Sequence, residues 1–217
     1  MDTLSFILKK YNLSRFQESP IELYCNRFYS FPNLFKQLGF TRGVEVGVAR
    51  GRFGIRLLQL MPKLKYFGVD VWRTYPGYVD IRSPRYMRRM YEDAMSKFAA
   101  FPKRAEIIRQ FSMDAVKRFA ENSIDFVYID AGHDYKSVSE DIRAWHKIVR
   151  KGGIVAGHDY TNAYRSDVYR VKEAVNDWIK EQDIKPLFLY TKKGDATWFY
   201  VKYDGYTRFH SRKIRTF

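Results

Sequence analysis

Short apolar runs alternate with longer amphipathic segments from Gly43 onward, and this alternation constrains the fold more than any other feature. The apolar runs lie at residues 44–46, 66–69, 106–108, 124–129 and 154–156, with weaker runs at 187–190 and 197–201. Helical spacing marks residues 52–61, 84–100, 113–122, 138–149 and 168–180. Strands that alternate with helices of this length form a mainly parallel sheet joined by right-handed crossovers. We therefore predict an α/β fold with a doubly wound, mainly parallel sheet of seven strands.

The last two apolar runs have no helical segment between them. The sequence LYTKKGDATW joins them, which predicts an antiparallel C-terminal hairpin with residues 192–195 as its loop. The first 40 residues instead show near-helical spacing at Leu4, Ile7 and Leu8, interrupted at Pro20 and Pro32. The expected organisation is a helical cap at residues 1–40, a ligand-binding α/β domain at 41–202 and a basic tail at 203–217.

The charge balance is strongly basic, with 39 Lys and Arg against 24 Asp and Glu and a formal net charge of +15. Such a balance favours acidic partners such as nucleic acid, anionic glycans or membrane surfaces. Cys25 is the single cysteine, which excludes an intrachain disulfide and a zinc site built from cysteines. Because there is no signal-peptide pattern and no stretch near the roughly 18 uncharged residues of a membrane span, we expect a soluble, cytoplasmic protein.

The segment GVEVGVARGRFG, residues 43–54, combines a strand, a glycine-bearing turn and the start of a helix. It lacks the G-x-G-x-x-G spacing of a dinucleotide site, and the carboxylate of Glu45 suits a ligand that carries an ammonium group. Asp70 ends the next strand, where a carboxylate can accept hydrogen bonds from ribose hydroxyls. Together these residues predict a nucleoside site. Alternatively, Gly47 and Gly51 are ordinary turn glycines, and Asp70 caps the next segment.

Acidic residues and histidines follow the fourth and fifth predicted strands. Asp130 and His133 follow one strand, and His158 with Asp159 follows the other. If these strands are neighbours, the four side chains converge on one rim, where carboxylates can hold a divalent cation and a neutral histidine can remove a proton. The alternative is that each residue is a cap or a loop residue.

Four other polar residues are interpreted without a role in the site. We expect Asp134 to belong to the turn and Asp141 to lie on a solvated helix face. We expect His146 to be a surface or half-packed residue of its helix, and His210 to be solvated in the tail.

The order EVGVARG followed by YFGVD resembles the nucleoside-binding half of the class I S-adenosylmethionine-dependent methyltransferases, which share a Rossmann-like fold. The resemblance implies that Glu45 lies near the methionine moiety and that Gly47 and Gly51 pass under the cofactor. It also implies that Asp70 holds the ribose. The cofactor-binding residues that it implies are Glu45, Gly47, Gly51, Asp70, Val71, Phe111, Ser112 and Asp130, with Phe111 and Ser112 beside the adenine. A core residue and a helix N-cap are the alternative for that last pair.

The fragment IDAGHDYKSVSEDIRAWHKIVRKGGIVAGHDY is similar to metal-dependent O-methyltransferases that act on sugars in macrolide biosynthesis. The resemblance implies that Asp130 is a metal ligand, that His133 is the general base and that His158 and Asp159 complete a Mg or Mn site. The chain departs from that pattern at His158, where those enzymes carry a carboxylate. Imidazole is a poor ligand for magnesium, so both the identity of the metal and the need for one stay open.

Two regions concentrate basic residues. Residues 82–104 hold seven Lys and Arg against two acids, including Arg85, Arg88 and Arg89, and the tail holds four against one. Basic residues mixed with aromatic ones can follow a nucleic-acid backbone, but a solvated face is the commoner explanation. Residues 72–89, with Tyr75, Tyr78 and Tyr86, are interpreted as a lid over an anionic acceptor.

The working hypothesis is a methyltransferase that delivers a methyl group to a hydroxyl of a small-molecule or glycan-like acceptor. His133 and Asp130 would be catalytic, and Asp130, His158 and Asp159 would bind the metal. Two alternatives are methylation of RNA and a nucleoside-binding module without catalysis. The sequence leaves open whether the cap and tail cover the site or pair subunits into a homo-oligomer.

Overall fold

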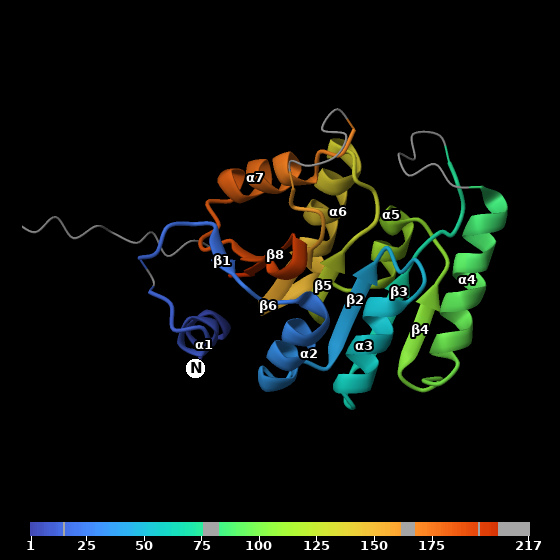
Figure 1. The fold of residues 1–217 in the computed structure, drawn as a ribbon, viewed down its shortest axis with the longest axis horizontal. Coiled ribbons are helices and arrows are strands. Elements are labelled where there is room, and N and C mark those ends of the chain that lie inside the picture. Colours follow the sequence, from blue (N-terminus) through green and yellow to red (C-terminus); the bar gives the residue numbers. More distant parts are fainter. Residues whose placement is uncertain (15, 76–82, 162–167, 195, 204–217) are drawn as a thin grey trace, which may run out of the picture.

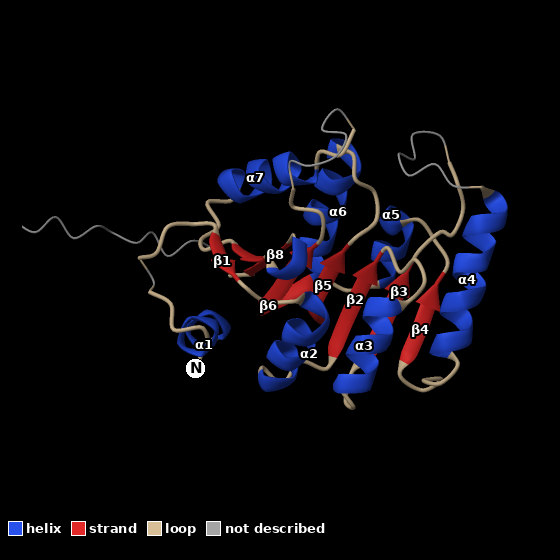
Figure 2. Cartoon of the chain, in the orientation of Figure 1, coloured by secondary structure: helices blue, strands red, loops and turns tan. Residues whose placement is uncertain are grey.

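The computed structural model describes residues 1–14, 16–75, 83–161, 168–194 and 196–203, and its centre is one eight-stranded sheet (Figures 1 and 2). The strands are β1 (Ile21–Leu23), β2 (Arg42–Val46), β3 (Lys65–Val69), β4 (Ala105–Ile108), β5 (Ile124–Ile129), β6 (Val149–Gly157), β7 (Phe188–Tyr190) and β8 (Thr197–Val201). Their order across the sheet is β1-β7-β8-β6-β5-β2-β3-β4. Only β8 runs antiparallel to its neighbours, β6 and β7. The predicted parallel sheet with an antiparallel hairpin is confirmed.

Helices cover both faces of the sheet (Figure 2). They are α1 (Thr3–Lys10), α2 (Arg27–Gln37), α3 (Arg52–Leu60), α4 (Pro84–Phe98), α5 (Ser112–Ala115), α6 (Tyr135–Ile148) and α7 (Val171–Glu181). One hydrophobic core joins the sheet to α1, α2, α3 and α4, and the other joins it to α5, α6 and α7. The parallel strands are therefore buried on both sides, which explains their nearly continuous apolar sequences.

The helix starts that border the site have local causes in the sequence. The Asp134 carboxylate accepts a hydrogen bond from the Ser137 backbone N–H at 3.0 Å and so caps α6. Asn26 caps α2 in the same way through Phe28 N–H. Gly51 precedes α3 with φ +73°, a left-handed conformation that glycine adopts without strain. Because these caps fix where each helix begins, they also fix which side chains face the ends of the strands.

The N-terminal 40 residues differ from the expected helical cap. Residues 21–23 form β1, which pairs in parallel with β7 at the sheet edge and raises the number of strands to eight. Pro32 does not interrupt a helix: α2 runs through it, and Pro32 is buried against the sheet. Proline is tolerated there because burial of the helix face against the core offsets one lost backbone hydrogen bond.

The helix predicted at residues 113–122 is much shorter in the structure, where α5 gives way to a 3₁₀ turn at Val116–Arg118. Residues 204–217 of the predicted tail, 203–217, lie outside the described residues, as do residues 76–82 of the expected lid. None of the helices in the described ranges combines the length and the apolar composition that a membrane span requires.

The chain leaves β2 outward through β3 and β4 and then returns to β5 on the other side of β2. Strand order therefore reverses between β2 and β5. In open α/β sheets, ligands bind at the carboxyl ends of the strands at such a reversal. This edge carries the loops after β2, β3 and β5, and these loops hold most of the residues singled out in the sequence.

Candidate active site

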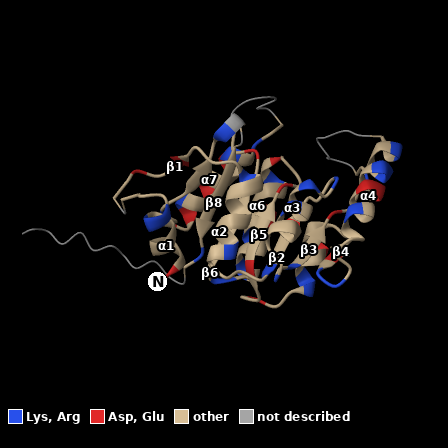
Figure 3. Cartoon of the chain, turned by 60° about the horizontal axis from the view of Figure 1, so that its bottom comes forward, with Lys and Arg blue, Asp and Glu red and all other residues tan. Residues whose placement is uncertain are grey.

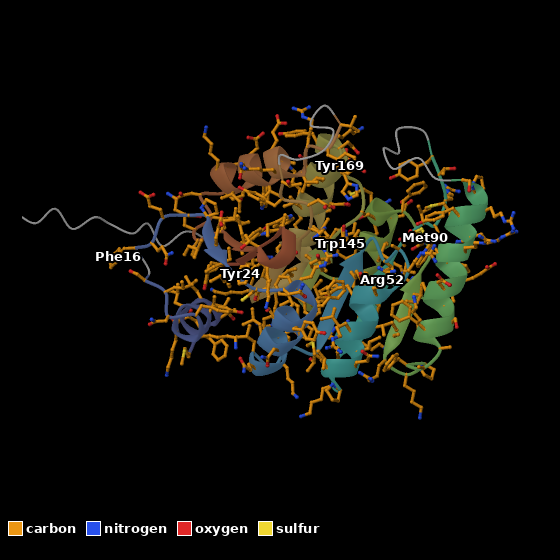
Figure 4. All side chains as sticks on the ribbon, in the orientation of Figure 1. Phe16, Tyr24, Arg52, Met90, Trp145 and Tyr169 are labelled. Carbon is orange, nitrogen blue, oxygen red and sulfur yellow. The ribbon has the colours of Figure 1, made fainter. Side chains whose placement is uncertain are left out.

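A cavity of about 780 Å³ lies at the carboxyl ends of β2, β3 and β5. Its walls contain seven of the eight residues predicted to bind the cofactor, namely Glu45, Gly47, Asp70, Val71, Phe111, Ser112 and Asp130. Arg52 from α3 and Met90 from α4 also line it, and Figure 4 shows Met90 on the side of α4 that faces the sheet. A cavity of this size accommodates a nucleoside with an amino-acid side arm.

Gly51, the eighth residue, does not line the cavity; it shapes the loop that does. Its positive φ starts α3, and a Cβ atom there would lie 2.9 Å from the Phe98 ring. Gly47 has φ +92°, and a Cβ atom there would lie 1.9 Å from the backbone oxygen of Asp130. The loop after β2 can therefore pack directly on the end of β5 only with glycine at position 47.

Glu45 is 3% exposed and accepts a hydrogen bond of 2.5 Å from the Tyr66 hydroxyl. Burial raises the pKa of Glu45 to about 8, although the Tyr66 hydrogen bond and the charge of Arg27 lower it. A buried carboxyl group that lacks a close cationic partner gains most from a ligand that brings one. The structure thus places Glu45 where a ligand ammonium group would be stabilised.

Asp70 follows β3, and its carboxylate organises the loop around it. Its Oδ2 accepts a hydrogen bond from Ala49 N–H at 2.9 Å, and its Oδ1 accepts one from Trp72 N–H at 2.8 Å. Burial raises the pKa of Asp70, and the backbone hydrogen bonds lower it in part. Because each carboxylate oxygen can accept a further hydrogen bond, Asp70 can also receive the hydroxyls of a ribose.

The end of the cavity beside β4 is built from aromatic and hydroxyl groups. The Phe111 ring meets the Tyr75 ring edge-on at 5.2 Å, and the Arg73 guanidinium lies 4.7 Å from the Phe111 ring centre. The Ser112 hydroxyl accepts a hydrogen bond from Trp145 Nε1 at 2.8 Å. Phe111 and Ser112 are both half-buried and face the cavity, so they are available to a planar base.

Asp141 was expected on a solvated helix face, and that expectation is wrong. The side chain is 4% exposed, lines the cavity and accepts a hydrogen bond from the Ser112 hydroxyl. Val138, Ile142 and Trp145 share its face of α6. Residues at spacing i, i+3, i+4 and i+7 lie on one side of a helix, so this apolar stripe was the signal that Asp141 is buried.

Asp130, His133 and Asp159 meet at the rim of the cavity. Each offers one ligand atom, and these atoms lie within 4.8 Å of one another. His133 Nε2 lies 2.9 Å from Asp159 Oδ2 and 3.9 Å from Asp130 Oδ1. The convergence predicted for the ends of the fourth and fifth strands is present, because β5 and β6 are neighbours in the sheet.

His158 stands behind this cluster, with Nδ1 3.0 Å from Asp159 Oδ1. It contacts Asp159 but is not one of the three groups that converge, whereas His133 is. Burial alone would raise the pKa of Asp159, but hydrogen bonds and charge from the two histidines lower it well below its usual range. Asp159 is therefore a carboxylate that holds two imidazole rings.

The cluster has the donor set of a divalent-cation site, with two carboxylates and one imidazole. Carboxylate oxygen suits magnesium and manganese, whereas imidazole nitrogen favours manganese and later transition metals. His133 Nε2 lies 2.9 Å from Asp159 Oδ2 and 3.9 Å from Asp130 Oδ1, separations that two ligands of one ion can have. The residues present therefore fit a transition-metal ion better than magnesium.

Arg27 and Tyr66 reach the site without a signal in the sequence. Arg27 comes from α2 and lines the cavity, with Nη1 3.9 Å from Asp130 Oδ2. Its position depends on how α2 packs on the sheet, which no local motif encodes. Tyr66 lies two strand positions before Gly68 and reaches Glu45 from the neighbouring strand.

The remaining predicted positions are placed as follows. His146 is partly buried and contacts the Tyr200 hydroxyl through Nδ1 at 3.0 Å, which agrees with a half-packed residue. Tyr75 and Tyr86, two residues of the predicted lid, line the cavity. Tyr78 and His210 lie outside the described residues.

Comparison with protein families decides what kind of protein carries this site. A family model described as a methyltransferase domain matches residues 44–160, more than half of the chain. The chain belongs to this family. The match confirms the resemblance to the class I S-adenosylmethionine-dependent methyltransferases and the enzyme class that it implies. No curated protein sequence matches this methyltransferase significantly.

Solved structures share the fold of the methyltransferase at low sequence identity. A Staphylococcus aureus protein named as a candidate caffeoyl-CoA O-methyltransferase is 13% identical, with 91% of each chain covered and a TM-score of 0.62. Cofactor-bound Rv0187 from MTB is 15% identical, with 93% and 90% covered and a TM-score of 0.61. An O-methyltransferase from Bacillus cereus in complex with SAH is 17% identical, with 92% and 90% covered and a TM-score of 0.59. These likenesses support the fold assignment.

Proposed function

We propose that the protein transfers a methyl group from S-adenosylmethionine to a hydroxyl oxygen of a small-molecule or glycan-like acceptor. The main observation behind this proposal is that the cavity that suits the cofactor adjoins groups that can remove a proton. The cavity that suits the cofactor ends at Asp130 and His133, and these residues adjoin Asp159. Groups that can remove a proton therefore lie next to the place where a methyl group would be presented. The similarity to solved O-methyltransferases supports oxygen as the acceptor atom.

The charges along the cavity suit the cofactor's amino-acid end. Glu45 would face the ammonium group, and Arg27, which is partly buried nearby, would face the carboxylate. Asp70 would hold the ribose hydroxyls, with Gly47 and Val71 in the adjoining walls. The chemistry that the bound cofactor supplies is an electrophilic methyl group on a sulfonium sulfur.

His133 is the proposed general base. A neutral alcohol is a poor nucleophile, so the hydroxyl proton must leave as the oxygen attacks. His133 stacks on Tyr169 with ring centres 4.9 Å apart, which fixes the ring plane. Asp159, 2.9 Å from Nε2, would stabilise the imidazolium that forms when His133 takes the proton. Asp159 is thus a positioning residue in this proposal.

Asp130, Asp159 and His133 are also the groups that would hold a divalent cation. The chemistry that such an ion supplies is a lower pKa for the acceptor's hydroxyl. His133 would then act as a ligand through Nε2, and its role as base would depend on whether the ion is present. Adding a chelator distinguishes His133 as a metal ligand from His133 as the base. An enzyme that does not need the ion keeps its activity when the chelator removes it.

Nucleic acid is the alternative acceptor. Figure 3 shows Lys and Arg on α4, near α7 and on loops below the sheet, with acidic residues interspersed. Some of these charges are paired, as Arg88 is with Glu92 at 3.9 Å. A surface that mixes acidic and basic residues supports nucleic-acid binding less strongly than one continuous basic patch would. Binding to RNA that falls steeply with added salt would favour this alternative.

Calorimetry with S-adenosylhomocysteine tests the proposal most directly. We expect saturable one-to-one binding with a Kd in the micromolar range or tighter. Glu45→Gln and Arg27→Met should each weaken the binding, whereas Glu121→Gln, a change at an exposed carboxylate, should leave it unchanged. Absence of binding at millimolar S-adenosylhomocysteine would overturn the proposed function.

A further inference from the structure

Asp141 is a buried carboxylate in the wall of the cavity. It is 4% exposed, and no Lys or Arg in the described part of the chain forms an ion pair with it. Burial raises the pKa of Asp141 to about 7, and the Ser112 hydrogen bond lowers it only in part. Burial of a carboxylate without a cationic partner costs stability, and proteins often keep such groups in clefts where a ligand or a reaction uses them. Its position in the cavity wall indicates that this use involves a ligand.

The hydrogen bonds around Ser112 have a fixed direction. Trp145 Nε1–H can only donate, and it donates to the Ser112 oxygen at 2.8 Å. Ser112 in turn donates its own proton to Oδ1 of Asp141. The chain from Trp145 through Ser112 to Asp141 therefore holds the carboxylate in one orientation. Oδ2 is not used by the Ser112 hydrogen bond and remains as an acceptor in the cavity wall.

The position of Asp141 determines which part of the ligand this side chain can contact. Phe111 and Ser112 form the end of the cavity where the proposed binding mode places the nucleoside base, and Asp141 contacts Ser112 there. Glu45 lies in β2 and Asp70 directly follows β3, and these two residues would take the amino-acid end and the ribose. An ionised carboxylate accepts hydrogen bonds and donates none. It therefore favours a base with an amino group at its edge over one with a carbonyl.

We propose that Asp141 determines specificity for the nucleoside base by accepting a hydrogen bond from the exocyclic 6-amino group of adenine. This inference rests on the proposed function. A base with a 6-carbonyl in the same place would bring its carbonyl oxygen next to the Asp141 carboxylate, and neither of these two acceptors could donate a hydrogen bond to the other. The cost of an unpaired buried polar group corresponds to about 10- to 100-fold in affinity.

The test is calorimetry at pH 8, where Asp141 is mostly ionised, with S-adenosylhomocysteine and its 6-oxo analogue S-inosylhomocysteine. The wild type should bind the adenosyl compound at least tenfold more tightly. Asp141→Asn keeps an acceptor oxygen for Ser112 and turns an amide N–H₂ toward the base. This variant should lose the preference or reverse it. Glu121→Gln changes an exposed carboxylate that does not line the cavity and should retain the wild-type preference.

The outcomes separate this inference from the proposed function. If the wild type binds both compounds equally, the role of Asp141 is overturned while the proposed function stands. If Asp141→Asn keeps the full wild-type preference, the role is overturned as well. If the wild type binds neither compound, the proposed function fails, and this inference fails with it. The comparison of two ligands on the wild type needs no variant, so a poorly folded Asp141→Asn would still leave a decisive measurement.

Discussion

Nε2 of His133 lies 2.9 Å from Oδ2 of Asp159, although the two residues stand 26 positions apart in the sequence. His133 follows β5 and Asp159 follows β6, and these strands are parallel neighbours. Asp159 has φ +57°, so its backbone turns sharply at the strand end and brings the carboxylate toward the imidazole. The pairing of carboxylate and imidazole is therefore a product of sheet topology.

Replacement of His133 by Gln should abolish most of the activity. Glutamine has a similar size but cannot take up a proton, so kcat should fall by about 10²- to 10⁴-fold with the acceptor that supports turnover of the wild type. Affinity for S-adenosylhomocysteine should change little. His146→Gln is the matched control, because His146 packs against Tyr200 and does not line the cavity. Equal losses in the two variants would refute the assignment of His133 as base.

Binding of Mn²⁺ tests the cluster as a metal site without an activity assay. Titration calorimetry of the wild type should show one site, and Asp130→Asn or Asp159→Asn should weaken it at least tenfold because each removes an anionic ligand. Asp114→Asn, which changes an exposed acid paired with Lys117, should have no effect. Identical titrations for all four proteins would show that the cluster does not bind the ion.

The raised pKa of Glu45 predicts how the free energy of unfolding depends on pH. The folded protein holds this proton up to about pH 8, whereas the unfolded chain releases it near 4.5. The stability that the protonated group contributes is therefore complete below 4.5 and is lost as the pH rises through 8. Glu45→Gln removes this titration. Its free energy of unfolding, relative to wild type, should increase by up to about 1.4 kcal/mol per pH unit between 4.5 and 8.

Urea unfolding at pH 6, 7, 8 and 9 measures this difference. It should grow from pH 6 to 8 and then level off, because Glu45 is ionised in both states above its folded pKa. Glu121→Gln is the matched control, since Glu121 is exposed. A constant difference between Glu45→Gln and wild type would mean that Glu45 keeps an ordinary pKa in the folded protein.

The carboxyl ends of the strands were predictable because two simple rules combine there. Apolar runs mark buried parallel strands, and polar residues directly after them share one edge of the sheet. Asp70 and Asp130 could therefore be assigned to one site without coordinates. The same rules predicted that His133 and Asp159 would meet, but could not decide whether His133 or His158 would face Asp130. That choice depends on the backbone turn at Asp159.

Other features needed tertiary structure. β1 is only three residues long and becomes a strand because β7 offers it an unpaired edge. Arg27 enters the cavity because α2 packs on the sheet, where the Phe31 ring of α2 meets the Tyr128 ring of β5 edge-on. No local pattern predicts such long-range packing. Asp141 differs, because the spacing of the apolar residues of α6 in the sequence already indicates that position 141 is buried.

Lys202 offers a last prediction, on stability away from the site. It is 8% exposed, and its Nζ donates hydrogen bonds to Val149 O at 2.8 Å, Asn122 Oδ1 at 3.0 Å and Lys147 O at 3.3 Å. A cation at the end of α6 is also favoured by the helix dipole. Lys202→Met keeps the length of the chain but leaves these acceptors without their donor, so unfolding should become easier by about 1–3 kcal/mol.

Urea unfolding should show this loss as a lower midpoint with an unchanged slope, since the surface exposed on unfolding stays the same. Lys103→Met is the matched control, because Lys103 is exposed, and its midpoint should stay within error of the wild type. Affinity of Lys202→Met for S-adenosylhomocysteine should also be retained, because Lys202 does not line the cavity. Equal midpoints for the two variants would show that the hydrogen bonds of Lys202 only offset the cost of burying its charge.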